Sequence, residues 1–379
     1  LQSIIICLSK IKKNSIKAQE KLLKPYNLSS RYTGYIMALS EGDGMTMKEL
    51  SDTLGVDPAN TTRVISTLTE MGYVGNDCKK EGSRKFNVFL TQEGKDIAEK
   101  MKKDIVNYGL EPGIPNMHSL KVLCGVLEER GVNDYPIHLK LDTGMHRLGF
   151  MTDELAELVD YLKTCHAVKV KSIYSHLAAA DEPEQDEFTV SQVELFLKNA
   201  DRLSEELGYK PMYHILNSAG IERFPQYQFD MVRLGIGIYG VSALPDVKLS
   251  PVASFKCKIL QIKTLNPGDG TIGYGRHGRI SPDGTVIATI PVGYADGLDR
   301  HLSRGAASFS LNGHRVPTIG NICMDMTMLD ITGVDAEVGD TVTIFGADPT
   351  ISELASILGT IPYEILTSVP RRIERVIVK

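Results

Sequence analysis

The chain has 379 residues, of which 42% are hydrophobic and 23% are charged, and its formal net charge is −5 at pH 7. This composition excludes a disordered or collagen-like protein, and the length predicts two or three domains at roughly 100–200 residues each. The charge is divided unevenly, because residues 1–107 carry a net +4 and the remainder carries −9. The basic front is therefore a candidate for contact with nucleic acid, although a merely solvated surface would carry the same charge.

The sequence contains no apolar run that approaches the roughly 18 residues of a membrane span. The opening LQSIIICLSK has no small-residue cleavage site, so we do not interpret it as a signal peptide. The six cysteines are scattered and form no CxxC pair, which is typical of reduced thiols rather than of disulfides or a metal site. We therefore expect a cytoplasmic protein without membrane contact or bound metal.

The front segment has the pattern of a DNA-binding module. Apolar residues at helical spacing predict helices over residues 1–24 and 31–41. A third helix begins after Thr46, which stands three residues before Glu49 in a capping-box pattern, and a fourth begins with Pro58. The last two of these helices, joined by a tight turn, form a predicted helix-turn-helix.

Residues 73–101 then predict a strand, a polar hairpin tip, a second strand and a further helix that ends near Val106. Short polar groups and cations at the start of a recognition helix suit base edges and phosphates, and cations at a hairpin tip suit a groove or the DNA backbone. Each lysine taken singly is equally typical of a solvated loop. The predicted DNA contacts are Asn60, Thr61, Thr62, Arg63, Lys80 and Arg84.

With this order of elements, residues 1–106 resemble the MarR family of winged-helix transcription regulators. The resemblance implies an α+β winged helix-turn-helix domain that binds double-stranded DNA, with residues 57–68 as the recognition helix and Arg84 as the wing arginine. MarR proteins usually end in further long helices that build a dimer. Here the last predicted helix stops near Val106, so the resemblance does not extend to that dimer or to the operator spacing that it sets.

Residues 108–245 alternate strand-like runs with helical runs, which is typical of βαβ units in a parallel sheet. Helices are expected over residues 153–164 and 190–208. The predicted strands are residues 137–142, 168–177, 213–218 and 231–240. Four strands would make half of a (β/α) TIM-type barrel. After Pro251 the pattern changes to strands separated by Gly and Asp turns, so residues 246–379 are predicted to form a separate, mostly β domain.

Polar residues and glycines gather where the predicted barrel strands end. In chain order these residues are Lys140, Arg147, His176, Ser218, Arg233, Gly235 and Ile236. Arg233 leads into a Gly-rich turn, where backbone N–H groups can face a phosphate. The β domain adds Tyr274 in IGYGR, Tyr294 in PVGYADG, and Met324 and Asp325 in GNICMDMT.

Taken together, these motifs resemble the alanine racemase family, and residues 108–379 resemble its C-terminal two-thirds. The resemblance implies a homodimeric enzyme that uses pyridoxal 5′-phosphate (PLP) to interconvert L- and D-alanine. It implies that Tyr274 is the catalytic acid or base on one face of the substrate. The implied cofactor contacts are Lys140, Arg147, His176, Ser218, Arg233, Gly235 and Ile236. The implied substrate contacts are Arg147, Tyr294, Met324 and Asp325.

Two features depart from the family pattern. The family attaches PLP through a lysine within a run like VKADAYGHG, and no such run occurs in this sequence. Where many members carry a phosphate-binding tyrosine near the C-terminus, this chain has Arg371. We therefore predict a racemase-like chain that is poorly active alone. Two alternatives stay open, namely a transcription regulator whose rear domain binds PLP or another ligand, and a chimeric reading frame.

Overall fold

The structure is a computed structural model of the chain. It describes residues 28, 30–40, 42–54, 56, 58–77, 86–244, 247 and 249–378. The chain divides into two compact units, of which the first comprises residues 1–215 and 227–231 and the second comprises residues 216–226 and 232–379. The helix predicted over residues 1–24 and the predicted DNA contacts Lys80 and Arg84 lie outside the described residues. Among the described helices, none is both long and apolar enough to cross a membrane.

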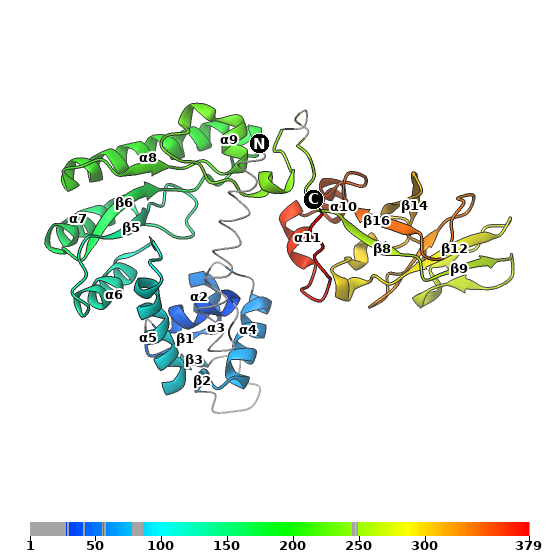
Figure 1. Cartoon of the computed structure of the whole chain (residues 1–379), viewed down its shortest axis with the longest axis horizontal. Coiled ribbons are helices and arrows are strands. Elements are labelled where there is room, and N and C mark those ends of the chain that lie inside the picture. The colour runs from blue at the N-terminus through cyan, green and yellow to red at the C-terminus, as the bar shows by residue number, and fades with distance from the viewer. Residues whose placement is uncertain are drawn as a thin grey trace. The chain divides into compact units, whose positions relative to one another are not determined.

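The first unit begins with a winged helix-turn-helix, drawn in blue to cyan in Figure 1. Its elements are α2 (Ser30–Leu39), β1 (Met45–Thr46), α3 (Met47–Leu54), α4 (Pro58–Glu70), β2 (Val74–Asn76), β3 (Asn87–Leu90) and α5 (Gln92–Asn107). The strands pair antiparallel in the order β1-β3-β2. Ile36, Leu50 and Leu68 are fully buried and join α2, α3 and α4. The predicted helix-turn-helix with its wing strands is confirmed.

Local capping explains where α3 begins. The backbone N–H of Thr46 donates to Glu49 Oε2 at 2.8 Å, and the N–H of Glu49 donates to Thr46 Oγ1 at 3.2 Å. This is the reciprocal capping box that the sequence predicts, and it satisfies two N–H groups that the first helical turn leaves without a partner. The following helix α4 starts with Pro58, which needs no N–H partner at that position.

A four-stranded parallel sheet with helices follows in the same unit. Its elements are β4 (Gly113–Ile114), α6 (Met117–Glu128), β5 (Tyr135–Lys140), α7 (Leu155–Thr164), β6 (Val168–Tyr174), α8 (Asp186–Leu207) and β7 (Met212–His214). The strand order is β4-β5-β6-β7, with every pair parallel. Along β5, Tyr135, Ile137 and Leu139 are buried, and the residues between them are partly exposed. This alternation places one face of the sheet against the helices seen beside it in Figure 1.

The strand predicted over residues 231–240 is wrong. The only regular element described there is the short 3₁₀ turn η5 (Ile236–Tyr239). Instead of joining a ladder, the N–H groups of Gly235 and Gly237 donate to the Ser218 hydroxyl. A strand needs a neighbour to pair with, and this segment bonds to a side chain. The fourth strand is β4, which the sequence pattern does not predict because it spans only two residues in a Gly- and Pro-rich stretch.

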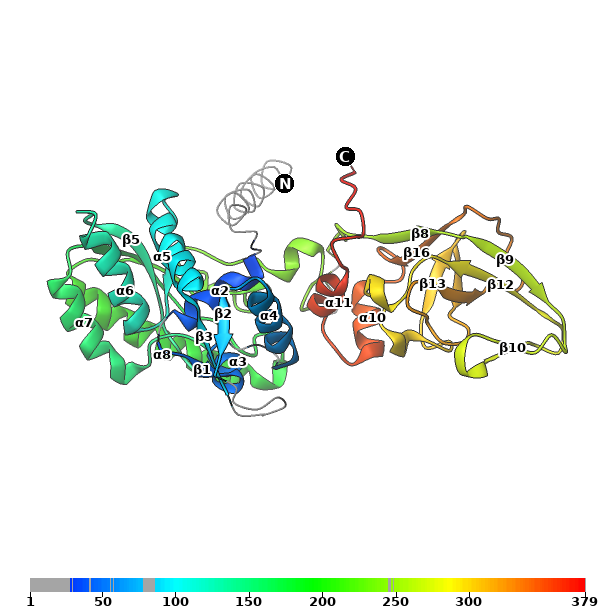
Figure 2. The same cartoon turned by 90° about the horizontal axis from the view of Figure 1, so that it is seen from below.

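The second unit is mostly β, as predicted. Its strands are β8 (Phe255–Lys258), β9 (Gln261–Leu265), β10 (Thr271–Ile272), β11 (Gly278–Arg279), β12 (Thr285–Ile290), β13 (Ser308–Leu311), β14 (His314–Pro317), β15 (Thr327–Asp330) and β16 (Thr341–Phe345). The sheets run β14-β13-β16-β8, β15-β12-β9 and β10-β11, all antiparallel, and Figure 2 shows the first two side by side. Leu311, Leu329 and Val342 lie in their common core. Among the residues that the structure describes, the α-helices of this unit are α9 (Ser218–Arg223), α10 (Ile351–Leu358) and α11 (Pro362–Ser368).

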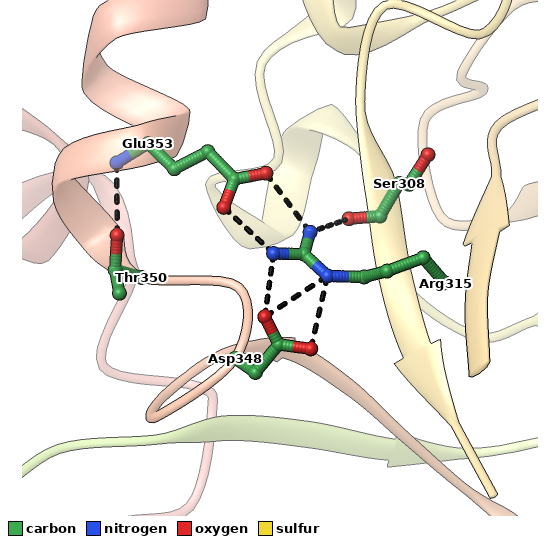
Figure 3. Close-up of polar contacts among 5 residues, drawn as sticks. All are labelled: Ser308, Arg315, Asp348, Thr350 and Glu353. Atoms are coloured by element: carbon green, nitrogen blue, oxygen red, sulfur yellow. Dashed lines mark hydrogen bonds and ion pairs between the residues drawn. The ribbon is translucent and has the colours of Figure 1, made fainter. Parts of the chain in front are cut away.

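An ion-pair cluster holds α10 to the sheet (Figure 3). The guanidinium of Arg315, on β14, donates to both carboxylate oxygens of Asp348 and of Glu353. Its fifth partner is the carbonyl oxygen of Ser308. The two carboxylates raise the pKa of Arg315. Because the planar guanidinium binds a carboxylate on each of two sides, this cluster fixes the start of α10 more firmly than a single surface ion pair would.

Candidate active site

A glycine turn in the second unit forms a cradle of polar groups. The backbone N–H groups of Gly235 and Gly237 donate to Ser218 Oγ at 2.8 and 3.1 Å. Between them, the N–H of Ile236 donates to the hydroxyl of Tyr363, on α11, at 2.8 Å. We call the set Ser218, Gly235, Ile236, Gly237 and Tyr363 the glycine cradle. Backbone N–H groups and hydroxyls are the donors that a phosphate group takes; here the N–H groups donate to the two hydroxyls, which keep protons of their own that they can donate to a phosphate.

The cradle depends on the absence of a side chain at Gly235. A Cβ atom there would stand 2.6 Å from the Tyr363 hydroxyl and 3.5 Å from Ser218 Oγ. Of the cradle residues, Ser218, Gly235 and Ile236 were predicted from the sequence as cofactor contacts, and the structure brings all three together. Tyr363 was missed. The sequence Pro362-Tyr363-Glu364 at the start of a C-terminal helix could have indicated it, whereas Arg371, the residue predicted in its place, is exposed.

The β domain contributes a separate cavity of about 420 Å³. Its lining residues are Tyr274, Tyr294, Arg300, Ile322, Cys323 and Met324. Three predicted site residues thus share one cavity, although they are far apart in the sequence. Tyr274 is 72% exposed, so its phenol is open to a ligand. The guanidinium of Arg300 adds a positive charge that suits a carboxylate.

The geometry of this cavity rests on a close approach of two backbone segments. The N–H groups of Tyr294 and Ala295 donate to the carbonyl oxygens of Cys323 and Met324, both at 3.0 Å. A Cβ atom on Gly293 would overlap those carbonyl oxygens. Only glycine therefore lets the PVGYADG segment pack against the GNICMDMT segment.

Asp325, a predicted substrate contact, takes part in an ion-pair network. It is not one of the residues that line the cavity, and its Oδ1 atom lies 3.3 Å from a guanidinium nitrogen of Arg372. Arg372 also donates to the buried Asp296 at 2.7 Å. The predicted substrate contact thus sits in an ion-pair network beside the cavity. The contact of Asp325 with substrate stays a prediction.

Of the remaining predicted residues, Lys140, Arg147 and His176 lie at or after the ends of β5 and β6, in the first unit. Arg233 lies in the second unit, where its backbone N–H donates to the Leu216 carbonyl oxygen at 3.0 Å. Lys140 is the last residue of β5 and is half-buried, and His176 follows β6. The loop after β5 is ordered by Asp142, whose Oδ1 accepts from the N–H groups of Gly144 and His146 at 3.0 Å. Arg147 is exposed at the end of this loop. The roles of Lys140, Arg147 and His176 as cofactor contacts stay predictions.

A chain of side-chain hydrogen bonds crosses the parallel sheet. Glu111 Oε2 lies 3.1 Å from His138 Nε2, whose other ring nitrogen lies 2.6 Å from Ser172 Oγ. Ser172 Oγ lies 3.0 Å from His214 Nε2. Lys171 donates to both Glu111 oxygens at 2.8 Å and, together with His138, lowers the pKa of Glu111. Ser172 is fully buried, so its hydroxyl links strands rather than meeting a ligand.

On the winged helix, the start of α4 divides into an exposed and a buried side. Asn60, Thr62 and Arg63 are exposed, as expected of DNA contacts. Thr61 is fully buried, and its Oγ1 accepts from the Ser51 hydroxyl at 2.8 Å. The prediction that Thr61 contacts DNA is therefore wrong, because its hydroxyl ties α4 to α3. The mistake arose because residue type alone does not say which face of a helix is covered.

Comparison with known families finds three matching regions. Residues 78–243 match the alanine racemase N-terminal domain, and residues 252–377 match the alanine racemase C-terminal domain. Residues 36–77 match the IclR helix-turn-helix domain. The resemblance to MarR is therefore wrong at the level of the family, although the winged helix-turn-helix is correct. The spacing of the two helices predicts a helix-turn-helix, but it does not distinguish a MarR domain from an IclR domain.

The chain matches individual relatives over only part of their length. An alanine racemase of Chlorobaculum tepidum is 40% identical over 248 residues, which are 64% of this chain and 63% of the relative. An alanine racemase of Synechocystis is 36% identical over 72% of this chain and 75% of the relative. The crystal structure of alanine racemase from Bartonella henselae, with covalently bound pyridoxal phosphate, superposes with a TM-score of 0.63 at 28% identity, covering 72% of this chain and 74% of that one. The chain belongs to the alanine racemase family and carries a helix-turn-helix domain in front of its racemase segment.

Proposed function

We propose that this chain binds PLP through the glycine cradle and takes L- and D-alanine as ligands, with low racemase activity by itself. The observation that carries the proposal is the convergence of the Gly235, Ile236 and Gly237 N–H groups on two hydroxyls. When bound, PLP supplies an electron sink that acidifies the Cα–H bond of an amino acid. The residues of this chain hold the phosphate end and offer polar groups to the amino acid.

The cavity of the β domain supports an amino acid as the ligand. Arg300 offers a cation for its carboxylate, and Tyr274 offers a phenol that can take or give a proton at Oη. Met324 lines the same cavity, where its backbone N–H is the predicted contact for the carboxylate. The distribution of a cation, a phenol and apolar side chains suits a small amino acid such as alanine.

Low activity is proposed because no run like VKADAYGHG occurs in the chain. That run carries the lysine that both anchors PLP and moves a proton on the second face of the substrate. Without it, PLP is expected to bind through its phosphate and to exchange with free PLP. Borohydride treatment should then leave PLP attached to no lysine, and a reduced adduct mapped to Lys140 would contradict this.

The test is a titration of the purified chain with PLP, read by fluorescence, with inorganic phosphate as competitor. Ser218→Ala should weaken PLP binding, whereas Ser356→Ala, on the exposed side of α10, should not. D-alanine formation is measured in the same samples. Rapid D-alanine formation, with host racemase excluded by a control purification, would refute low activity but not PLP binding.

A second function is favoured by the winged helix. Its recognition helix α4 presents Asn60, Thr62 and Arg63 to solvent, and residues 1–107 carry a net +4. We propose that this domain binds double-stranded DNA. Fluorescence anisotropy with a labelled duplex should show binding that weakens steeply as salt rises, because bound cations release counterions from the phosphates. Binding that is absent at 50 mM salt would contradict this function.

A further inference from the structure

Two buried thiols face each other in the first unit. Cys124 lies on α6 and is fully buried, and Cys165 follows the last residue of α7 and is 7% exposed. The thiol of Cys165 donates to Cys124 Sγ at 3.0 Å, across 41 residues of sequence. An S–S bond is about 2.0 Å long, so the two sulfur atoms are within roughly 1 Å of bonding distance. Cys257 and Cys323, by contrast, lie in the second unit.

The elements that carry these thiols are already packed together. Lys121, one turn before Cys124 on α6, pairs with Glu157 on α7 at 3.1 Å. The side chain of Tyr161, one turn before Cys165, influences the pKa of the Cys124 thiol and therefore lies close to it. Joining the two sulfur atoms therefore requires a small adjustment of side chains rather than a rearrangement of helices.

The two thiols differ in access. Burial and the neighbouring Cys165 raise the pKa of Cys124 to about 12, so Cys124 stays protonated at neutral pH. A protonated buried thiol is a poor target for an oxidant. Both thiols are buried, and Cys165, at 7% exposure against 0% for Cys124, is the one that solvent can reach, so we place the first oxidation there.

We propose that Cys124 and Cys165 form a reversible intramolecular disulfide when the chain meets a peroxide. The Cys165 sulfur attacks one peroxide oxygen, the O–O bond breaks, and a sulfenic acid and one water form. The Cys124 sulfur then attacks the Cys165 sulfur, the S–O bond breaks, and the leaving hydroxide takes the Cys124 proton as a second water. In total, two thiols and one hydrogen peroxide give one disulfide and two waters. A dithiol reductant reverses the bond by exchange.

The disulfide would join α6 to the end of α7 and close the chain segment between Cys124 and Cys165 into a loop. Closing a loop lowers the entropy of the unfolded chain, so the oxidised form should unfold at a higher temperature. From typical disulfide energies, the rise in Tm is roughly 4–10 °C. The cross-link lies outside the glycine cradle and the cavity of the β domain, so binding of PLP should not change with oxidation.

The test uses the full chain treated with hydrogen peroxide, then alkylated, digested and mapped by mass spectrometry. The expected result is one linked pair of peptides, Cys124 with Cys165, that disappears after dithiothreitol, together with the higher Tm. Cys257→Ser should keep both signals, and Cys124→Ala or Cys165→Ala should remove both. Two free thiols after full oxidation, or a link to any other cysteine, would overturn the proposal. Since the wild-type map decides the outcome, it stands even if a variant fails to fold.

Discussion

The hydroxyl of Tyr363 accepts a 2.8 Å hydrogen bond from the backbone N–H of Ile236, across 127 residues of sequence. This bond ties the C-terminal helix α11 to the glycine cradle. Ser218 closes the same turn from α9, so two elements hold three N–H groups in place. A site held in this way is formed before its ligand arrives, which lowers the entropy cost of binding.

Tyr363→Phe should weaken PLP binding by roughly fivefold, since one hydrogen-bonding group worth about 1 kcal/mol is lost from the cradle. The measurement is the dissociation constant from the fluorescence titration. Tyr108→Phe is the matched control, because Tyr108 is exposed in the other unit. Equal affinities in the two variants would show that the Tyr363 hydroxyl takes no part.

Gly235→Ala should reduce PLP binding by more than tenfold while the chain stays folded. The added methyl would meet the Tyr363 hydroxyl at 2.6 Å and fill the space of the cradle. Gly125→Ala is the control, since a Cβ there has no neighbour within 4 Å among the described residues. Placed inside α6, that control should even raise stability by roughly 0.5–1 kcal/mol. Circular dichroism reports whether both variants are folded.

Arg63→Ala should weaken DNA binding and reduce the steepness of its salt dependence by about one phosphate contact. Thr69→Ala, an exposed change near the end of α4, should leave binding unchanged. Thr61→Val should instead destabilise the winged helix, because it removes the buried 2.8 Å hydrogen bond between α3 and α4 and leaves the Ser51 hydroxyl bonded only to the Met47 carbonyl oxygen. If Arg63→Ala and Thr69→Ala bind alike in a gel shift at several salt concentrations, α4 is not the recognition helix.

Tyr35→Phe should leave stability unchanged or raise it by up to about 1 kcal/mol. The Tyr35 hydroxyl is buried and has no hydrogen-bond partner among the described residues, so its removal saves a desolvation cost. Tyr135→Phe is the contrasting change, because the Tyr135 hydroxyl lies 2.7 Å from the Leu110 carbonyl oxygen. Urea unfolding should show a loss of about 1 kcal/mol for Tyr135→Phe, and a similar loss for Tyr35→Phe would contradict the assignment.

Acid should destabilise the first unit partly through Glu111. Lys171 and His138 hold the pKa of this carboxyl below its ordinary value of 4.5. A lowered carboxyl pKa gives stability that is fully present above about pH 4.5 and is lost as the pH falls through the folded value. Glu111→Gln should therefore be less stable than the parent chain at pH 6.5, with a smaller difference at pH 3. A difference that does not shrink in acid would exclude this carboxylate as the cause.

Much of the architecture follows from short-range pattern. The winged helix is predictable because the Thr46 and Glu49 cap and Pro58 act within one helical turn. The helices α7 and α8 and the change to a β domain follow from periodicity in the same way. The segments with Tyr274, Tyr294 and Met324 identify the family because each motif is complete within a few residues.

Only the tertiary structure determines the relationships between residues that are distant in the sequence. Sequence pattern alone does not indicate that Tyr363 reaches Ile236, that Thr61 faces Ser51, or that Cys124 meets Cys165. The predicted strand at 231–240 failed for the same reason, since a strand exists only where a neighbour supplies its hydrogen bonds. Local backbone preference depends on adjacent residues, whereas the burial of side chains and the pairing of strands depend on which surfaces the folded chain brings together.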